Sequence, residues 1–107
     1  MMVLIRGEDK TGEIETIRHD SENRKIHITY RNSVKEYSHN PNSVIILENP
    51  KIIAPNGQAA YVNGILIENP KLILEFESHV RIIQDDGTAC TIRRELFSAI
   101  KNIITAN

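Results

Sequence analysis

The clearest pattern in the chain is an alternation of apolar and polar residues over 25–31, Lys-Ile-His-Ile-Thr-Tyr-Arg. Apolar side chains recur there at every second position, which is the period of a half-buried β-strand. Asn32-Ser33 follows and predicts a turn. A two-residue turn places Ile28 opposite Tyr37 on the returning strand, so apolar groups collect on one face. We therefore expect a β-hairpin over residues 24–39.

A further strand is expected upstream, over residues 12–18. Its apolar residues Ile14 and Ile17 are three positions apart, a spacing that strict alternation does not give. A β-bulge within the strand, or a short helix in its place, would account for this spacing.

Two more hairpins are predicted from their turns. Asn63-Gly64 is the strongest two-residue hairpin signal, because both residues accept a positive φ. In the next hairpin, a three-residue loop of Asp85, Asp86 and Gly87, with Gly87 in the left-handed conformation, is favoured over a two-residue loop. Only the longer loop gathers the apolar residues of both strands on one face: Val80, Ile82, Cys90 and Ile92.

A short sequence occurs twice, twenty positions apart: Leu-Glu-Asn-Pro-Lys-Ile-Ile over 47–53 and Ile-Glu-Asn-Pro-Lys-Leu-Ile over 67–73. Proline fixes its own φ and disfavours helical geometry in the residue before it. We expect each Asn-Pro to be a reused corner that ends one strand and begins the next, with the asparagine in an extended conformation.

The end of the chain has a different period. Residues 72–76 still alternate like a strand, but apolar residues from Arg94 to Ile104 recur at helical spacing. A short amphipathic helix is expected there. It ends at Thr105-Ala106-Asn107 without an evident cap, which is typical of a chain excised from something longer.

Together these patterns predict a mainly β fold. The favoured architecture is a small SH3-like barrel or a rolled antiparallel sheet of hairpins, with one short C-terminal helix. An open α+β sheet is the alternative. A length of 107 residues indicates a single domain over residues 1–107.

Composition narrows the class of protein further. Apolar residues make up 40% of the chain, and 13 basic residues nearly balance 14 acidic ones, so bulk charge points to no partner. The single cysteine allows no internal disulfide, and no apolar stretch reaches the ~20 residues of a membrane span. We expect a cytoplasmic protein without a signal peptide.

Candidate catalytic groups do not converge in the sequence. The predicted register places His27 and His39 on adjacent strands but on opposite faces, Cys90 falls on an apolar face, and Asp85-Asp86 suits a turn. Nucleotide-binding and common hydrolytic motifs are absent from the sequence. We expect no free-standing enzyme, no metal and no cofactor.

The best candidate binding surface is the first hairpin. Four basic residues lie within twelve positions there, beside two tyrosines, and such groups can hold phosphates and stack bases. Glu22 and Glu36 flank this cluster and weaken it. The cluster predicts at most weak, sequence-independent nucleic-acid binding through four residues: Arg24, Lys25, Arg31 and Lys35.

The segment from Ile26 to Val44 resembles the start of certain bacterial superfamily 1 DNA helicase-like ATPases. Those proteins carry a small N-terminal β domain in which a strand precedes the pattern Lys-x-Tyr-x-x-Asn-Pro-x-x-Val. The matching residues here are Lys35, Tyr37, Asn40, Pro41 and Val44. About a quarter of the chain is covered, and none of the family's ATPase motifs can be carried over.

The resemblance implies a non-catalytic accessory or interaction domain of a larger DNA-processing protein whose motor lies beyond Asn107. Its expected partner is another protein or the remainder of its own chain. Direct, weak nucleic-acid binding is the alternative function. We expect neither a membrane nor a small-molecule ligand as partner.

Overall fold

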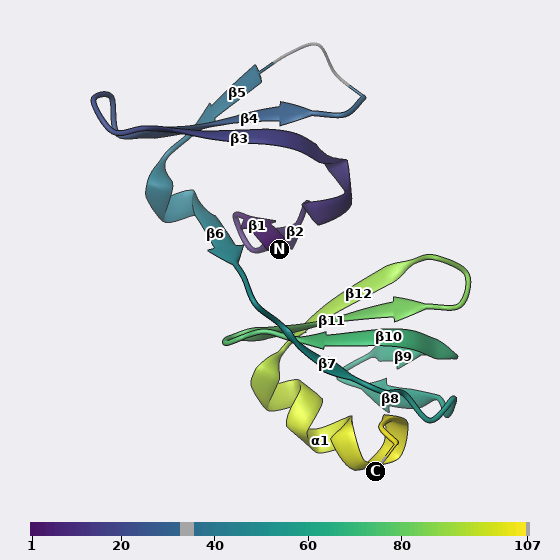
Figure 1. The fold of residues 1–107 in the computed structure, drawn as a ribbon. Helices are drawn as coiled ribbons and strands as arrows, with labels where there is room; N and C mark the ends of the chain where they lie inside the picture. The colour runs from purple at the N-terminus through teal and green to yellow at the C-terminus, as the bar shows by residue number, and fades with distance from the viewer. Residues whose placement is uncertain (33–35, 107) are drawn as a thin grey trace. The chain divides into compact units, whose positions relative to one another are not determined.

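A computed structural model describes residues 1–32 and 36–106. Contacts within the chain divide it into two compact units, Met1–Glu48 and Asn49–Asn107 (Figure 1). Each unit has an apolar core of its own. The single domain over residues 1–107 stays a prediction.

Unit 1 contains two antiparallel three-stranded sheets, in the orders β2-β1-β6 and β3-β4-β5. Short 3-10 helices precede β3 and β6. Its elements are β1 (Met2–Ile5), β2 (Glu8–Asp9), η1 (Thr11–Glu13), β3 (Ile14–Asp20), β4 (Lys25–Tyr30), β5 (Glu36–His39), η2 (Pro41–Ser43) and β6 (Val44–Leu47).

The predicted first hairpin is confirmed where the structure describes it. Ile28 of β4 is fully buried and lies opposite Tyr37 of β5. Tyr37 is nevertheless 47% exposed and meets Tyr30 edge to face, with ring centroids 5.6 Å apart. The expected partner of Tyr30, Lys35, lies outside the described residues.

The irregular spacing in β3 arises from a β-bulge. Ile14 pairs with Tyr30 and Thr16 with Thr29, so Glu15 is an extra residue in the ladder. The bulge allows Ile14 and Ile17 both to pack in the core of unit 1, although they are three positions apart. The strand with a bulge is therefore confirmed, and the 3-10 helix η1 precedes it.

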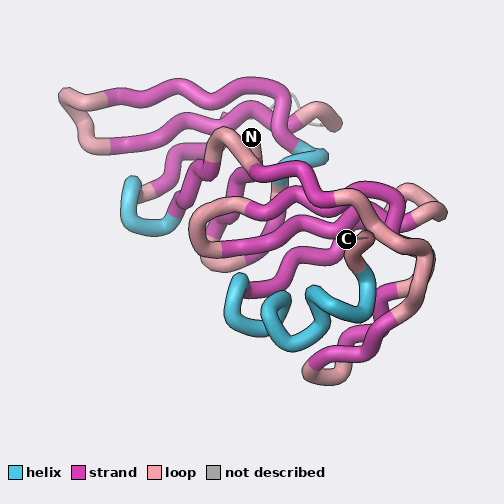
Figure 2. The backbone as a smooth tube through the Cα atoms, turned by 60° about the horizontal axis from the view of Figure 1, so that its bottom comes forward, coloured by secondary structure: helices cyan, strands magenta, loops and turns pink. Residues whose placement is uncertain are grey.

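Unit 2 contains a four-stranded antiparallel sheet in the order β12-β11-β10-β7, a separate β8-β9 hairpin and the helix α1. Figure 2 shows α1 lying along the strands of this unit. Its elements are β7 (Lys51–Ile53), β8 (Ala60–Val62), β9 (Ile65–Ile67), β10 (Pro70–Glu75), β11 (His79–Gln84), β12 (Ala89–Arg93) and α1 (Arg94–Ile104).

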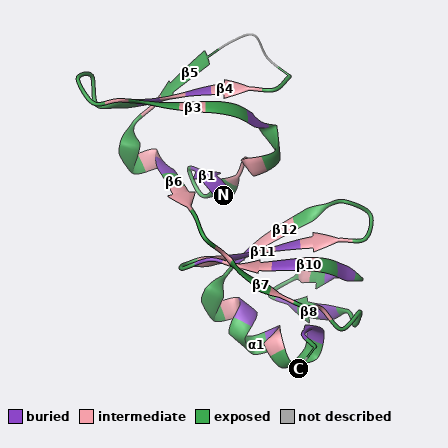
Figure 3. Ribbon diagram, viewed as in Figure 1, coloured by how far each residue is buried: buried purple, intermediate pink, exposed green. Residues whose placement is uncertain are grey.

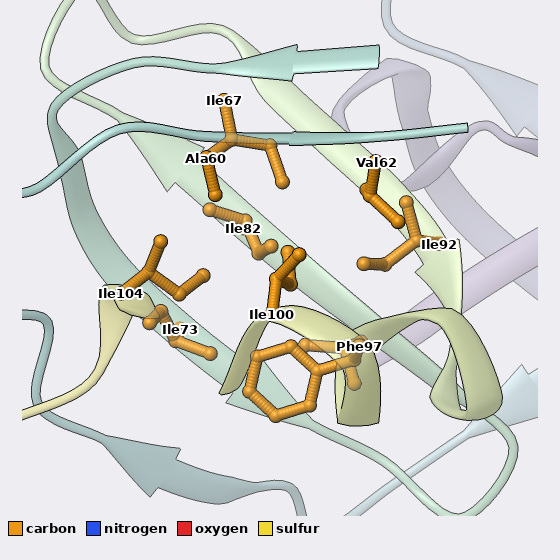
Figure 4. Close-up of a cluster of buried hydrophobic side chains, with 10 residues drawn as sticks. Ala60, Val62, Ile67, Ile73, Ile82, Ile92, Phe97, Ile100 and Ile104 are labelled. Atoms are coloured by element: carbon orange, nitrogen blue, oxygen red, sulfur yellow. The ribbon is translucent and has the colours of Figure 1, made fainter. Parts of the chain in front are cut away.

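The helix has the bounds that the apolar period predicted. Its buried residues Phe97, Ile100 and Ile104 pack among strand residues such as Ile73 and Ile82 (Figure 4). Because the sheet is covered on this face by one helix, the amphipathic period of α1 and the strand periods meet in a single core.

Both turn-based predictions in unit 2 are confirmed. Val62 pairs with Ile65 around Asn63-Gly64, whose φ angles are 48° and 81°. Ile82 pairs with Cys90 across the three-residue loop, and Gly87 has a φ of 87°. Cys90 packs against the core but is only partly buried.

The Asn-Pro corners lie where expected, but the conformation expected for their asparagines is wrong. Asn49 and Asn69 have φ angles of 53° and 45°, in the left-handed region rather than the extended one. Asparagine adopts this region more readily than most residues, because its short polar side chain bonds locally. Each corner therefore turns more sharply than an extended residue before proline would allow.

The mainly β fold with antiparallel sheets and one C-terminal helix is confirmed. Across the described strands the ladders form separate sheets and do not close into a barrel. Of the two forms that were predicted, the structure therefore agrees with the rolled sheet of hairpins and not with the closed barrel. In the described part of the chain, no helix combines the length and apolarity needed to cross a membrane.

Candidate nucleic-acid interface

The loop between β3 and β4 carries Arg24, and the first residue of β4 is Lys25, so two of the four basic residues singled out from the sequence lie together here. The loop spans residues 21–24, between the paired residues Asp20 and Lys25. The Asp20 carboxylate holds the loop in shape, since it accepts hydrogen bonds from the backbone N–H of Asn23 at 3.2 Å and from its side-chain amide at 2.9 Å. Residues 21–25 are all exposed (Figure 3).

An open pocket of about 440 Å³ lies beside this loop. The ends of β3 and β4, the loop and the first residue of η2 form its wall, and the buried Ile26 contributes an apolar part. The lining residues are His19, Asp20, Ser21, Arg24, Lys25, Ile26 and Pro41. The hairpin thus gathers both basic residues around one hollow.

Neither basic residue at the pocket takes part in an ion pair among the described residues. Other cations of unit 1 do: Lys10 lies 3.4 Å from Glu8, and Arg18 lies 3.2 Å from Glu36. Arg24 and Lys25 therefore present their charges to solvent, where an anion can reach them.

Asp20 is the one carboxylate in the lining, and it stays ionised at neutral pH. Hydrogen bonds from Asn23 and then from His27 lower the pKa of Asp20 to about 2. Its charge offsets one of the two cations, so the charged residues of the lining sum to +1. The pocket is therefore weakly cationic.

His27 shares a face of the sheet with Asp20 and Lys25, opposite to Ile26, and belongs to a polar network that the sequence analysis missed. Its Nε2 lies 3.3 Å from Asp20 Oδ2, and its Nδ1 lies 2.8 Å from Ser38 Oγ. The predicted register did contain the signal, because it placed Ser38 directly opposite His27. His39 pairs instead with Ile26, which confirms that the two histidines occupy opposite faces.

The remaining candidates from the sequence do not join the pocket. Arg31 follows the far end of β4, about 20 Å from Lys25 at the usual rise of a strand, and its Nε donates to the carbonyl of Ile14 at 3.2 Å. Lys35 lies outside the described residues. The structure therefore brings together Arg24 and Lys25 and separates Arg31 from them.

Two other candidate residues from the sequence also have defined positions: Cys90 packs against the core of unit 2, and Asp86 lies in a turn. Burial raises the pKa of the Cys90 thiol. Asp86 accepts hydrogen bonds from the backbone N–H and hydroxyl of Thr88, which lower its pKa and fix the loop. In the part of the chain that the structure describes, no three His, Cys, Asp or Glu residues are placed to share a metal ion.

No family model, no curated protein and no solved structure matches this chain.

Proposed function

We propose that the chain is a non-catalytic accessory domain of a larger DNA-processing protein and that it contacts nucleic acid through the loop between β3 and β4. The observation that supports this proposal is the pocket lined by Arg24 and Lys25, neither of which forms an ion pair with another described residue. The segment that resembles helicase-like ATPases begins immediately after this loop, at Ile26.

The loop suits contact with the phosphate backbone. It forms the tip of the β3-β4 hairpin, which projects from its sheet in Figure 1. A projecting tip can bring Arg24 and Lys25 to a strand of nucleic acid without rearrangement, although Asp20 and Glu22 balance their charge and keep the contact weak. Phosphates carry no sequence information, and such contacts bind all sequences similarly. The proposed binding is therefore weak and independent of sequence.

The salt dependence of binding measures the number of phosphates contacted. Two cations at the loop give a slope of about −2 for log Kobs against log salt concentration on duplex DNA. The dissociation constant should lie around 10⁻⁴–10⁻⁶ M at physiological salt. The double variant Arg24→Gln with Lys25→Gln should weaken binding at least tenfold in a fluorescence anisotropy titration, because both contacts are lost.

A matched control removes the same charge elsewhere. Lys51 and Lys71 are exposed lysines of unit 2, and the double variant Lys51→Gln with Lys71→Gln should bind within about twofold of the parent chain. Equal weakening by both double variants would show that net charge, rather than this loop, determines binding. That result would refute the proposal.

A contact with another part of the same larger protein is a second candidate function. On the β8-β9 hairpin, Tyr61 pairs with Leu66, and these side chains are 68% and 51% exposed. Their neighbours Ala60 and Ile67 are buried in the core, so the exposed pair forms the outer face of the hairpin. The titration separates the two candidates, because contact through this face needs neither Arg24 nor Lys25.

A further inference from the structure

We infer that the pocket beside the β3-β4 loop receives the terminal phosphate of a nucleic-acid strand, a phosphomonoester, rather than an internal phosphodiester. The inference rests on the proposed function and names the ligand group of the same site. The juxtaposition that supports it is an open hollow lined by Arg24 and Lys25, which have no ion-pair partner within residues 1–32 and 36–106, next to the apolar Ile26 and Pro41.

The size of the site admits a strand end. A volume of about 440 Å³ lies within the range of about 300–1,000 Å³ that is usual for ligand pockets. The hollow is open to solvent, and a strand end can place both its terminal phosphate and its last nucleoside in it. The apolar surface of Ile26 and Pro41 can contact that nucleoside while the cations contact the phosphate.

The charges of the site favour a monoester. A terminal phosphate carries about −1.5 to −2 charges at neutral pH, whereas an internal diester carries one. The guanidinium of Arg24 can hold two oxygens of such a group at once, and Lys25 adds a point charge. Ser21 offers a hydroxyl donor. The Asp20 oxygens accept hydrogen bonds from Asn23 and His27, and because Asp20 stays ionised, the two cations of the lining exceed its charge by one.

The backbone at Arg24 supplies an independent observation. Its φ is 52°, in the left-handed region that glycine and asparagine favour. Among the described residues, seven of the nine with a positive φ are glycine or asparagine, and the exceptions are Arg6 and Arg24. An arginine is conformationally unfavourable at both positions, but of the two only Arg24 lines the pocket, where its side chain can contact the phosphate.

The test compares two oligonucleotides of one sequence, each labelled at the 3′ end, with either a phosphate or a hydroxyl at the 5′ end. The full chain should bind the phosphorylated strand at least fivefold more tightly in an anisotropy titration. Arg24→Gly should reduce this preference to less than twofold, while the melting temperature stays equal or rises because the left-handed position is relieved.

Arg6→Gly is the matched control, because it also replaces an arginine at positive φ but outside the pocket. It should keep the fivefold preference. If Arg24→Gly does not fold, Lys25→Gln takes its place and should lower the same preference. Retention of the preference in both pocket variants would overturn the inference.

Two further measurements are needed. One distinguishes a nucleic-acid strand from a free nucleotide as the ligand, and the other distinguishes this inference from the proposed contact with the phosphate backbone. A nucleoside 5′-monophosphate titrated alone should bind more weakly than the phosphorylated strand, and tighter binding of the free nucleotide would assign the pocket to nucleotides instead. Equal affinity for both strands, with a salt slope of about −2, would overturn this inference and leave the backbone contact standing. No binding of either strand would refute both.

Discussion

Replacing Phe97 by alanine is expected to lower the free energy of unfolding of unit 2 by about 3–5 kcal/mol. Phe97 is fully buried and is the largest side chain that α1 places in the core of this unit (Figure 4). Alanine would remove most of its apolar surface from the core and leave a cavity that the surrounding isoleucines can fill only in part.

Urea unfolding followed by far-ultraviolet circular dichroism measures this effect. Ile103→Ala is the matched control, because Ile103 is on the same helix and is 44% exposed. It should lower the free energy of unfolding by less than about 1 kcal/mol. Similar losses for the two variants would contradict the packing of α1 described above.

Replacing Asn56 by alanine is expected to lower the free energy of unfolding by roughly 1–2 kcal/mol. The last carbonyls of a helix have no partner within it. Asn56 supplies partners here: its side-chain amide donates to the carbonyl of Ile103 at 2.7 Å and to that of Thr105 at 3.3 Å, and its backbone N–H donates to Ile104 at 2.9 Å. The side-chain bonds would be lost.

The variant Asn56→Asp tests the N–H donor of the Asn56 side chain separately from the rest of that side chain. Aspartate keeps the oxygen that accepts from the backbone N–H of Gln58, but it cannot donate to the two carbonyls. It also places a negative charge at the helix C-terminus, where the dipole disfavours it. Its thermal unfolding midpoint should fall at least as far as that of Asn56→Ala. Unchanged midpoints in both variants would show that Asn56 does not act as the cap.

This cap also shows where sequence reasoning was wrong. The helix ends without a local capping signal, and the sequence indicated an uncapped end. The cap lies 47 positions before Ile103, in the segment after β7. A cap of this kind depends on tertiary structure, and no local pattern around Thr105 encodes it.

Features with a local physical cause were predictable. The Gly87 loop follows from the requirement that Val80 and Ile92 share a face, and the structure has that register. The helix bounds follow from its apolar period. The bulge at Glu15 was predictable only as one of two alternatives, because spacing alone does not separate a bulge from a short helix.

The candidate site was predictable only in part. The sequence placed Arg24, Lys25, Arg31 and Lys35 on one hairpin, and the rise of a strand already separates Arg31 from Lys25 by about 20 Å, although the four were grouped as one cluster. Arg31 lies at the far end of β4, and Pro41 comes to the pocket from η2. The pocket therefore depends on how the chain returns after β5, which the strand period does not specify.

The most direct test of the central claim, that the β3-β4 loop contacts nucleic acid, is a titration of the ¹⁵N-labelled chain with a short single-stranded oligonucleotide, followed by NMR. The account predicts that the largest changes in amide chemical shift occur at residues 19–26 and grow smaller as salt is added. Changes centred instead on Tyr61 and Leu66, or on Arg31 alone, would contradict it.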